Sequence, residues 1–101
     1  MGKLDRNGYG LSILQDDQSR CYLCGRTDGK LDRHEVFGAA NRRKSKALGF
    51  WVMLCHEPCH RLAHGDRYYM DMLHKRGQMA AMATYKWTID DFRKEIGRNY
   101  L

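Results

Sequence analysis

Apolar residues form two short runs in the first half of the chain and follow a helical spacing in the second half. The segment 31–37 ends in two β-forming residues, and 50–54 is a continuous apolar run, so each predicts a β-strand. The two strands would pair as a hairpin whose connector, residues 38–49, is predicted to be a long basic loop. Residues 1–20 are polar and punctuated by glycines, which predicts an irregular arm.

From residue 59 onward, apolar residues recur at offsets of three and four, which predicts helices. Gly65 and Gly77 are expected to interrupt or cap them. A last helix is predicted to begin at Thr88, because Thr88-x-x-Asp91 has the form of a capping box, and to end near Gly97. The pattern therefore predicts one small α+β domain.

Composition limits the fold and the partners. A chain of 101 residues buries only a thin core. Its net charge of +6 suits a polyanion such as nucleic acid, although many small basic proteins bind none. No apolar run reaches the roughly 20 residues of a membrane span, and the N-terminus has no apolar signal core. We therefore expect no membrane partner and a cytoplasmic location.

Four cysteines stand in two close pairs, Cys21-x-x-Cys24 and Cys55-x-x-x-Cys59. Disulfides rarely persist in a reducing cytoplasm, and two pairs at this spacing suit a tetrahedral structural zinc, which we favour over two disulfides. The second pair is one residue wider than usual, so His56 is an alternative ligand to one thiol. A hairpin between the pairs and a helix after them would form a treble clef.

A second group of metal-binding side chains accompanies the cysteines. His60 and His64 are one helical turn apart and share a face of the predicted helix. His34-Glu35 lies on the first predicted strand, and a hairpin clamped to the helix would bring His34 opposite His60. These residues predict a second metal ion that serves chemistry. The alternative is a plain zinc module in which His64 is an exposed helix residue.

Together, these motifs resemble the HNH endonucleases with a ββα-metal fold, and in particular small HNH proteins of phages and prophages. The matching segments are Cys21–Cys24, Arg33–Gly38, Asn41-Arg42, Ser45, Trp51–Cys55, Cys59-His60 and, more loosely, Phe92–Lys94 and Gly97–Leu101. The resemblance implies an HNH-like zinc domain over residues 21–101 with a helical C-terminal extension. It also implies a metal-dependent endonuclease that nicks DNA. The alternative functions are a non-catalytic zinc-dependent DNA-binding module in phage recombination or packaging and, third, a protein-interaction zinc module.

The resemblance also assigns roles. The four cysteines would hold structural zinc, and His34 and His60 would hold a catalytic divalent cation, usually Mg²⁺. Glu35 stands where many members have a histidine as general base, and a carboxylate is the weaker base. In an alternative register His34 is the base, and His60 and His64 hold the cation.

The remaining expected site residues lie in and near the basic connector. Asn41 is the candidate for the central asparagine of the family, because its usual place is taken by Phe50. Basic residues here would contact DNA phosphates without sequence preference. They are Arg42, Arg43, Lys44, Lys46 and Arg61. The alternative is a solvated run of charge.

Overall fold

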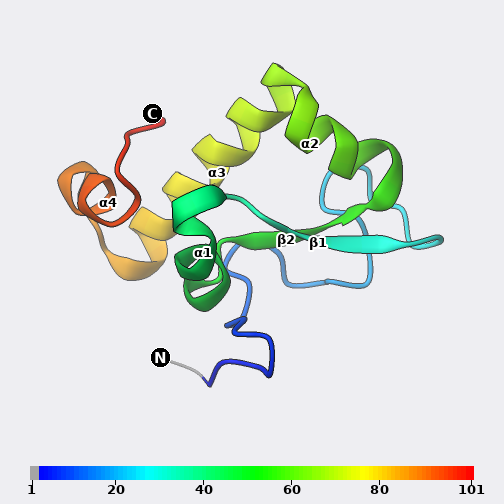
Figure 1. Ribbon diagram of the computed structural model, residues 1–101, viewed down its shortest axis with the longest axis horizontal. Coiled ribbons are helices and arrows are strands. Elements are labelled where there is room, and N and C mark those ends of the chain that lie inside the picture. The colour runs from blue at the N-terminus through cyan, green and yellow to red at the C-terminus, as the bar shows by residue number, and fades with distance from the viewer. Residues whose placement is uncertain (1–2) are drawn as a thin grey trace.

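A two-stranded antiparallel sheet lies between the N-terminal arm and the longest helix in the computed structural model, which describes residues 3–101 (Figure 1). Strand β1 (Leu31–Glu35) pairs with β2 (Trp51–Cys55), and His34 faces Val52 across the pair. Both predicted strands are confirmed. The first ends two residues early, because the chain leaves the sheet and turns Val36 into the core, where it is 3% exposed.

The prediction of a basic loop between the strands was wrong, because residues 38–49 contain a helix. A 3₁₀ turn, η1 (Ala39–Asn41), leads into α1 (Arg42–Leu48), whose arginines, lysines, alanine and leucine are good helix formers. Gly49 ends α1 in the left-handed region, with φ 84°. The buried Ser45 hydroxyl accepts from the Phe37 N–H at 3.1 Å and donates to the Phe37 carbonyl at 2.6 Å. These bonds fasten α1 to the end of β1.

The second half is helical, as predicted. Its elements are η2 (His56–His60), α2 (Arg61–Gly65), α3 (Arg67–Tyr85) and α4 (Ile89–Ile96). The expected capping box of Thr88 and Asp91 is present, and Gly97 caps the other end of α4 at φ 100°. None of the helices within residues 3–101 combines the length and the apolar character needed to cross a membrane.

Three phenylalanines join the sheet to the C-terminal helices. Phe37 follows β1, Phe50 precedes β2, and Phe92 lies on α4, and all three are at most 2% exposed. The Phe37 ring lies 5.6 Å from that of Phe50 and 5.4 Å from that of Phe92, both at steep angles typical of edge-to-face packing. This aromatic core fixes the end of the sheet against α3 and α4.

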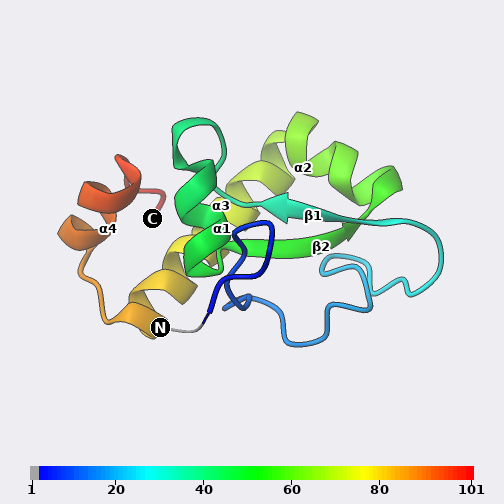
Figure 2. The same ribbon diagram turned by 60° about the horizontal axis from the view of Figure 1, so that its bottom comes forward.

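Residues 3–20 contain no helix or strand; their later part runs along β2 on the edge opposite β1, and their earlier part crosses to the side chains of β1 (Figure 2). The indole N–H of Trp51 donates to the Gly10 carbonyl at 2.9 Å, and the Ser12 hydroxyl donates to the Trp51 carbonyl at 2.6 Å. Further along, the Met53 N–H donates to the Gln15 side chain at 2.8 Å. The irregular arm is therefore fastened to the strand rather than separate from it.

The prediction that Gly77 interrupts or caps a helix was wrong, because α3 continues through it; its lack of a side chain is instead a packing requirement. A Cβ at this position of α3 would lie 2.9 Å from Phe37 Cζ and 2.9 Å from Val36 Cγ1, both in the core. We expect Gly77→Ala to destabilise the domain, because overpacking of about 1–3 kcal/mol exceeds the helix-propensity gain of about 1 kcal/mol. A Cβ at Gly65 meets nothing within 4 Å. Thermal melting should show a lower Tm for Gly77→Ala and an equal or higher Tm for Gly65→Ala, and equal effects would contradict this account.

Candidate metal centres and the cavity beside them

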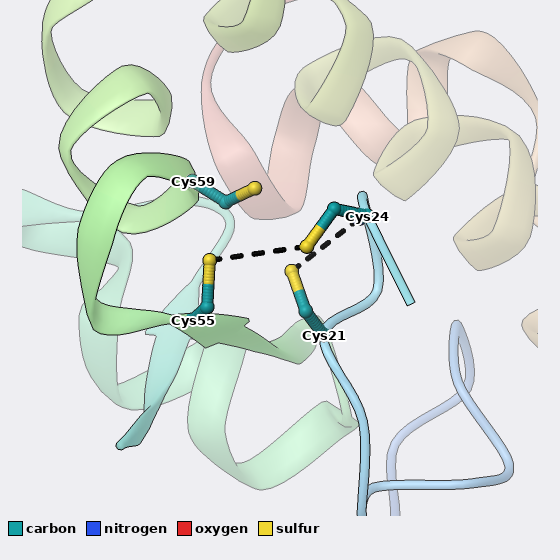
Figure 3. Close-up of side chains that lie close together, drawn as sticks. All are labelled: Cys21, Cys24, Cys55 and Cys59. Atoms are coloured by element: carbon teal, nitrogen blue, oxygen red, sulfur yellow. Dashed lines mark hydrogen bonds between the residues drawn. The ribbon is translucent and has the colours of Figure 1, made fainter. Parts of the chain in front are cut away.

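The four cysteines converge on one point, as Figure 3 shows. Their sulfur atoms all lie within 4.8 Å of one another, and all four are free thiols. Cys24 Sγ and Cys55 Sγ are 3.9 Å apart, close to the edge of about 3.8 Å expected for a thiolate tetrahedron around zinc with Zn–S bonds of about 2.3 Å. The cluster could therefore hold a metal such as zinc.

Backbone hydrogen bonds hold the first cysteine pair in a tight turn. The Cys21 N–H donates to the Arg26 carbonyl and the Gly25 N–H to the Cys21 carbonyl, both at 2.9 Å. Gly25 makes this turn with φ 78°. The Tyr22 N–H donates to the Met53 carbonyl at 2.8 Å, so the turn is anchored to β2 beside the second pair.

The second pair accommodates its extra residue through a kink. Cys55 ends β2 and Cys59 lies in η2, with Glu57 between them in an extended conformation (φ −142°, ψ 127°). The His56 ring points to Asp32, with its Nδ1 at 2.8 Å from Oδ2 of that carboxylate. The four thiols thus complete a donor set without the alternative ligand His56.

The thiols differ in acidity. Burial opposes ionisation of Cys21, but backbone N–H groups of Cys24, Cys55 and Leu23 outweigh it and lower the pKa of that thiol to about 7. Burial raises the pKa of Cys59, and the neighbouring thiols raise it further. Four crowded thiolates need a cation to coexist, so this chemistry fits a bound divalent metal.

Three imidazoles form a second cluster. His34 on β1, His60 at the end of η2 and His64 on α2 place one nitrogen each within 4.8 Å of the others. His60 Nε2 and His64 Nε2 are 3.2 Å apart, near the edge of about 3.3 Å for nitrogen ligands at metal distances of about 2.0–2.1 Å. All three histidines singled out in the sequence therefore meet. His64 is an exposed residue of α2, as the alternative interpretation held, yet its ring nitrogen is part of the cluster.

The electrostatic state of His34 suits a ligand. Its side chain is on the buried face of β1 and only 6% exposed. Burial, followed by the neighbouring His64 and His60, lowers the pKa of His34 to about 3. The ring is therefore neutral at physiological pH, and a neutral imidazole offers the lone pair that a metal binds.

Asp32 orients one of these histidines. The hydrogen bond from His56, opposed by burial and reinforced by His60, lowers the pKa of Asp32 to about 2. An ionised carboxylate only accepts, so His60 Nδ1, at 2.8 Å from Asp32 Oδ2, carries the proton and Nε2 is left to face the cluster. Sequence reasoning missed this residue, although its place two residues before His34 puts both on one face of β1.

Glu35 lies beside the cluster and is held at both carboxylate oxygens. The Tyr9 hydroxyl donates to Oε2 at 3.0 Å, and Arg42 Nε donates to Oε1 at 2.7 Å. Burial raises the pKa of Tyr9 and the bond to Glu35 raises it further, so this hydroxyl stays protonated and donates. Each carboxylate oxygen has two lone pairs, so each keeps one for a water molecule. Tyr9, 26 residues earlier in the chain, was not foreseen.

The Glu35 side chain and the three imidazoles line one cavity of about 370 Å³. Residues of the arm, β1, the turn that contains η1, α1, η2 and α2 form its walls. They are Tyr9, Arg33, His34, Glu35, Gly38, Ala39, Arg42, His60 and His64. A candidate proton acceptor and a candidate cation site therefore face the same space.

Two other predicted site residues bind α4 instead. Asn41 Nδ2 donates to the Ile96 carbonyl at 2.8 Å. Lys44 Nζ lies 3.1 Å from Glu95 Oε2 and donates to the Glu95 carbonyl at 2.6 Å. Neither residue is among those that line the cavity. Both therefore fasten α1 to the end of α4.

The remaining basic residues are divided between the cavities and an ion pair. Arg43 and Lys46 line a second cavity of about 760 Å³, which shares Ala39 and Arg42 with the first. Arg61 lies outside both and pairs, at 2.6 Å, with a glutamate four residues before it. The cationic surface next to the imidazoles is thus built from α1.

Comparisons of the chain with protein-family models, with curated proteins and with solved structures found no match. The two clusters and the cavities beside them are therefore the features of the chain that bear on its function.

Proposed function

We propose that this chain is a metal-dependent DNA endonuclease of the HNH type. In this proposal the four cysteines hold a structural zinc, and His34, His60 and His64 hold a second divalent cation. The observation that carries the proposal is that three imidazoles and the carboxylate of Glu35 face one cavity beside the cysteine cluster. A zinc module that served only protein contacts would need neither the imidazoles nor the carboxylate.

The order of elements supports a treble-clef, ββα-metal arrangement. Cys55 ends β2, Cys59 and His60 lie in the next turn, and α2 carries His64. Two antiparallel strands and a helix thereby surround the imidazole cluster, while the first cysteine pair closes the zinc site from the other side of β2. Helix α1, inserted between the strands, is an addition to the simple hairpin.

The donor set favours a transition-metal ion at the second site. Imidazole nitrogen suits Zn²⁺, Ni²⁺, Cu²⁺ or Fe²⁺, whereas Mg²⁺ prefers oxygen ligands. The ligand cluster contains three imidazoles and no carboxylate. The residues therefore do not fit the Mg²⁺ that the family resemblance implied. A divalent ion bound here would supply a positive charge that polarises the phosphate and stabilises the leaving oxygen.

Glu35 is the proposed general base. Tyr9 and Arg42 fix its carboxylate, and a free lone pair takes a proton from a water molecule in the cavity. The water oxygen then forms a bond to phosphorus as the bond from phosphorus to the leaving sugar oxygen breaks. That oxygen keeps the bonding electrons and takes up a proton from solvent, so one strand is nicked.

The cations of the second cavity support DNA as the substrate. Arg43 and Lys46 stand next to the proposed reaction site and could neutralise phosphates on the bound strand. The overall charge of +6 acts in the same direction. The proposed location is the cytoplasm of a bacterial host, where a reducing environment would keep the four cysteines available to a metal ion.

A plasmid-nicking assay tests the proposal. Zinc-loaded protein should convert supercoiled plasmid to nicked circles when Ni²⁺ or Co²⁺ is added, much less with Mg²⁺, and not without a second ion. Binding without cleavage under every ion would contradict the enzyme and favour the non-catalytic DNA-binding module. Neither binding nor cleavage would favour a protein-interaction module.

A further inference from the structure

We infer that the C-terminal segment, residues 97–101, and the adjoining side of α3 form the second half of the DNA-binding surface. One strand would then cross the imidazole cluster in a continuous trough, with α1 at one end and the C-terminus at the other. The inference rests on the proposed function, because it assigns the path of that substrate. It adds basic residues that are absent from the α1 surface.

The trough is defined by cavities that share walls. A third cavity of about 320 Å³ has His34 and His64 in common with the first, and it extends to Tyr100 near the C-terminus. A fourth cavity, of about 200 Å³, also includes Tyr100 and is lined by Lys75 and Arg98. The imidazoles therefore lie in the middle of a row of adjoining cavities, and Arg43 and Lys46 line the cavity at the α1 end.

The far end of the trough carries free positive charge. Lys75 and Arg98 are exposed, and neither forms an ion pair with any residue of the described chain. Within residues 3–101, the one acidic side chain that lines the fourth cavity, Asp71, lies 3.6 Å from Arg67, so the three basic side chains of the cavity outnumber it. The Arg98 guanidinium lies over the Tyr100 ring at 5.0 Å, which keeps it beside the trough.

The C-terminal wall is a fixed part of the fold. The amide of Gln78, a fully buried residue of α3, donates to the Asn99 side chain at 2.7 Å and accepts from the Tyr100 N–H at 2.7 Å. The Tyr100 ring stacks on Phe37, with centroids 5.5 Å apart, and lies 4.4 Å from the His74 ring. These bonds hold the C-terminal segment against α3 before any ligand binds (Figure 1).

The chemistry of the trough matches a nucleic-acid strand. Phosphates need cations, which stand at both ends, whereas sugars and bases tolerate the apolar and aromatic walls between them, formed in part by Met70, Leu73 and Tyr100. A small anionic metabolite would need only one of these ends. The separation of the two cationic ends by the imidazole cluster therefore favours an extended polyanion.

The test compares three double variants that each remove two positive charges. Lys75→Gln/Arg98→Gln removes the far end, and Arg43→Gln/Lys46→Gln removes the near end. Arg20→Gln/Lys86→Gln is the control, because both residues are exposed and line none of the four cavities. Fluorescence anisotropy with a labelled duplex, over a range of salt concentrations and without a second metal ion, reports binding in the absence of cleavage.

Both trough variants should bind about tenfold more weakly, and the slope of log K against log salt should fall by about one for each phosphate that the variant no longer neutralises. The control should change affinity by less than about threefold, since its charges lie away from the bound strand. If wild-type protein binds and nicks DNA but the Lys75/Arg98 variant matches the control, this inference fails and the proposed function stands. If the wild type does not bind DNA, both fail.

Discussion

Cys55→Ser is expected to unfold the domain. Cys55 is 1% exposed at the end of β2, where its thiol meets the first cysteine pair. A structural zinc contributes about 10–16 kcal/mol in small zinc domains, which equals or exceeds the net stability of about 5–15 kcal/mol of a typical protein. Circular dichroism should therefore show loss of the native helical spectrum and of cooperative melting, and elemental analysis should show loss of the tightly bound zinc.

Cys24→Ser separates the loss of a ligand from damage to the core. Cys24 is exposed, whereas the other three cysteines are buried, so its replacement removes one zinc ligand but leaves no buried cavity. We expect this variant to unfold as well. Chelation of zinc from the wild type should unfold it, and added zinc should restore the spectrum. A Cys24→Ser protein with native dichroism and an unchanged Tm would show that the cysteines do not hold a structural metal.

His60→Ala is expected to reduce nicking by about a thousandfold or more while zinc content and DNA affinity remain close to wild type. His60 is the only cluster member oriented by Asp32, and its loss removes one of three ligands to the second ion. The matched control is His56→Ala. The His56 ring also bonds to Asp32, but it lies outside the imidazole cluster. The nicking rate of this control should stay within a few-fold of wild type. Equal losses in both variants would contradict a specific role for His60.

Glu35→Gln tests which residue is the base. It keeps the shape of the side chain but removes the proton acceptor, so nicking should fall by about 10²–10⁴-fold. His64→Ala should have a milder effect if the two remaining imidazoles still retain some metal. A small effect of Glu35→Gln with a large effect of His64→Ala would instead favour His34 as base, with the cation held by His60 and His64.

The sequence predicted what depends on local spacing. The two cysteines of each pair lie in one turn because they are three or four residues apart, and His60 and His64, four residues apart, share a helix face. The apolar run before Cys55 located β2, and Thr88 located the start of α4. These features need no knowledge of distant contacts, which is why they could be predicted from the chain alone.

What the sequence did not reveal depends on tertiary contacts or on ambiguous composition. Helix α1 was missed because its basic residues also suit a solvated loop; Gly49, directly after Leu48, was the available C-cap signal. Asp32 meets His60 only because β1 runs beside η2. Tyr9 reaches Glu35 because the arm is fastened to β2, a contact that no local pattern encodes.

Native mass spectrometry of the protein after exposure to Zn²⁺ and Ni²⁺ tests the two-site account most directly. The wild type should carry two metal ions per chain, one held tightly and one exchangeable. Substitution of His34 or His60 by alanine should leave one ion on a folded protein. A wild type that never carries more than one ion, or a His60→Ala variant that still carries two, would contradict the account.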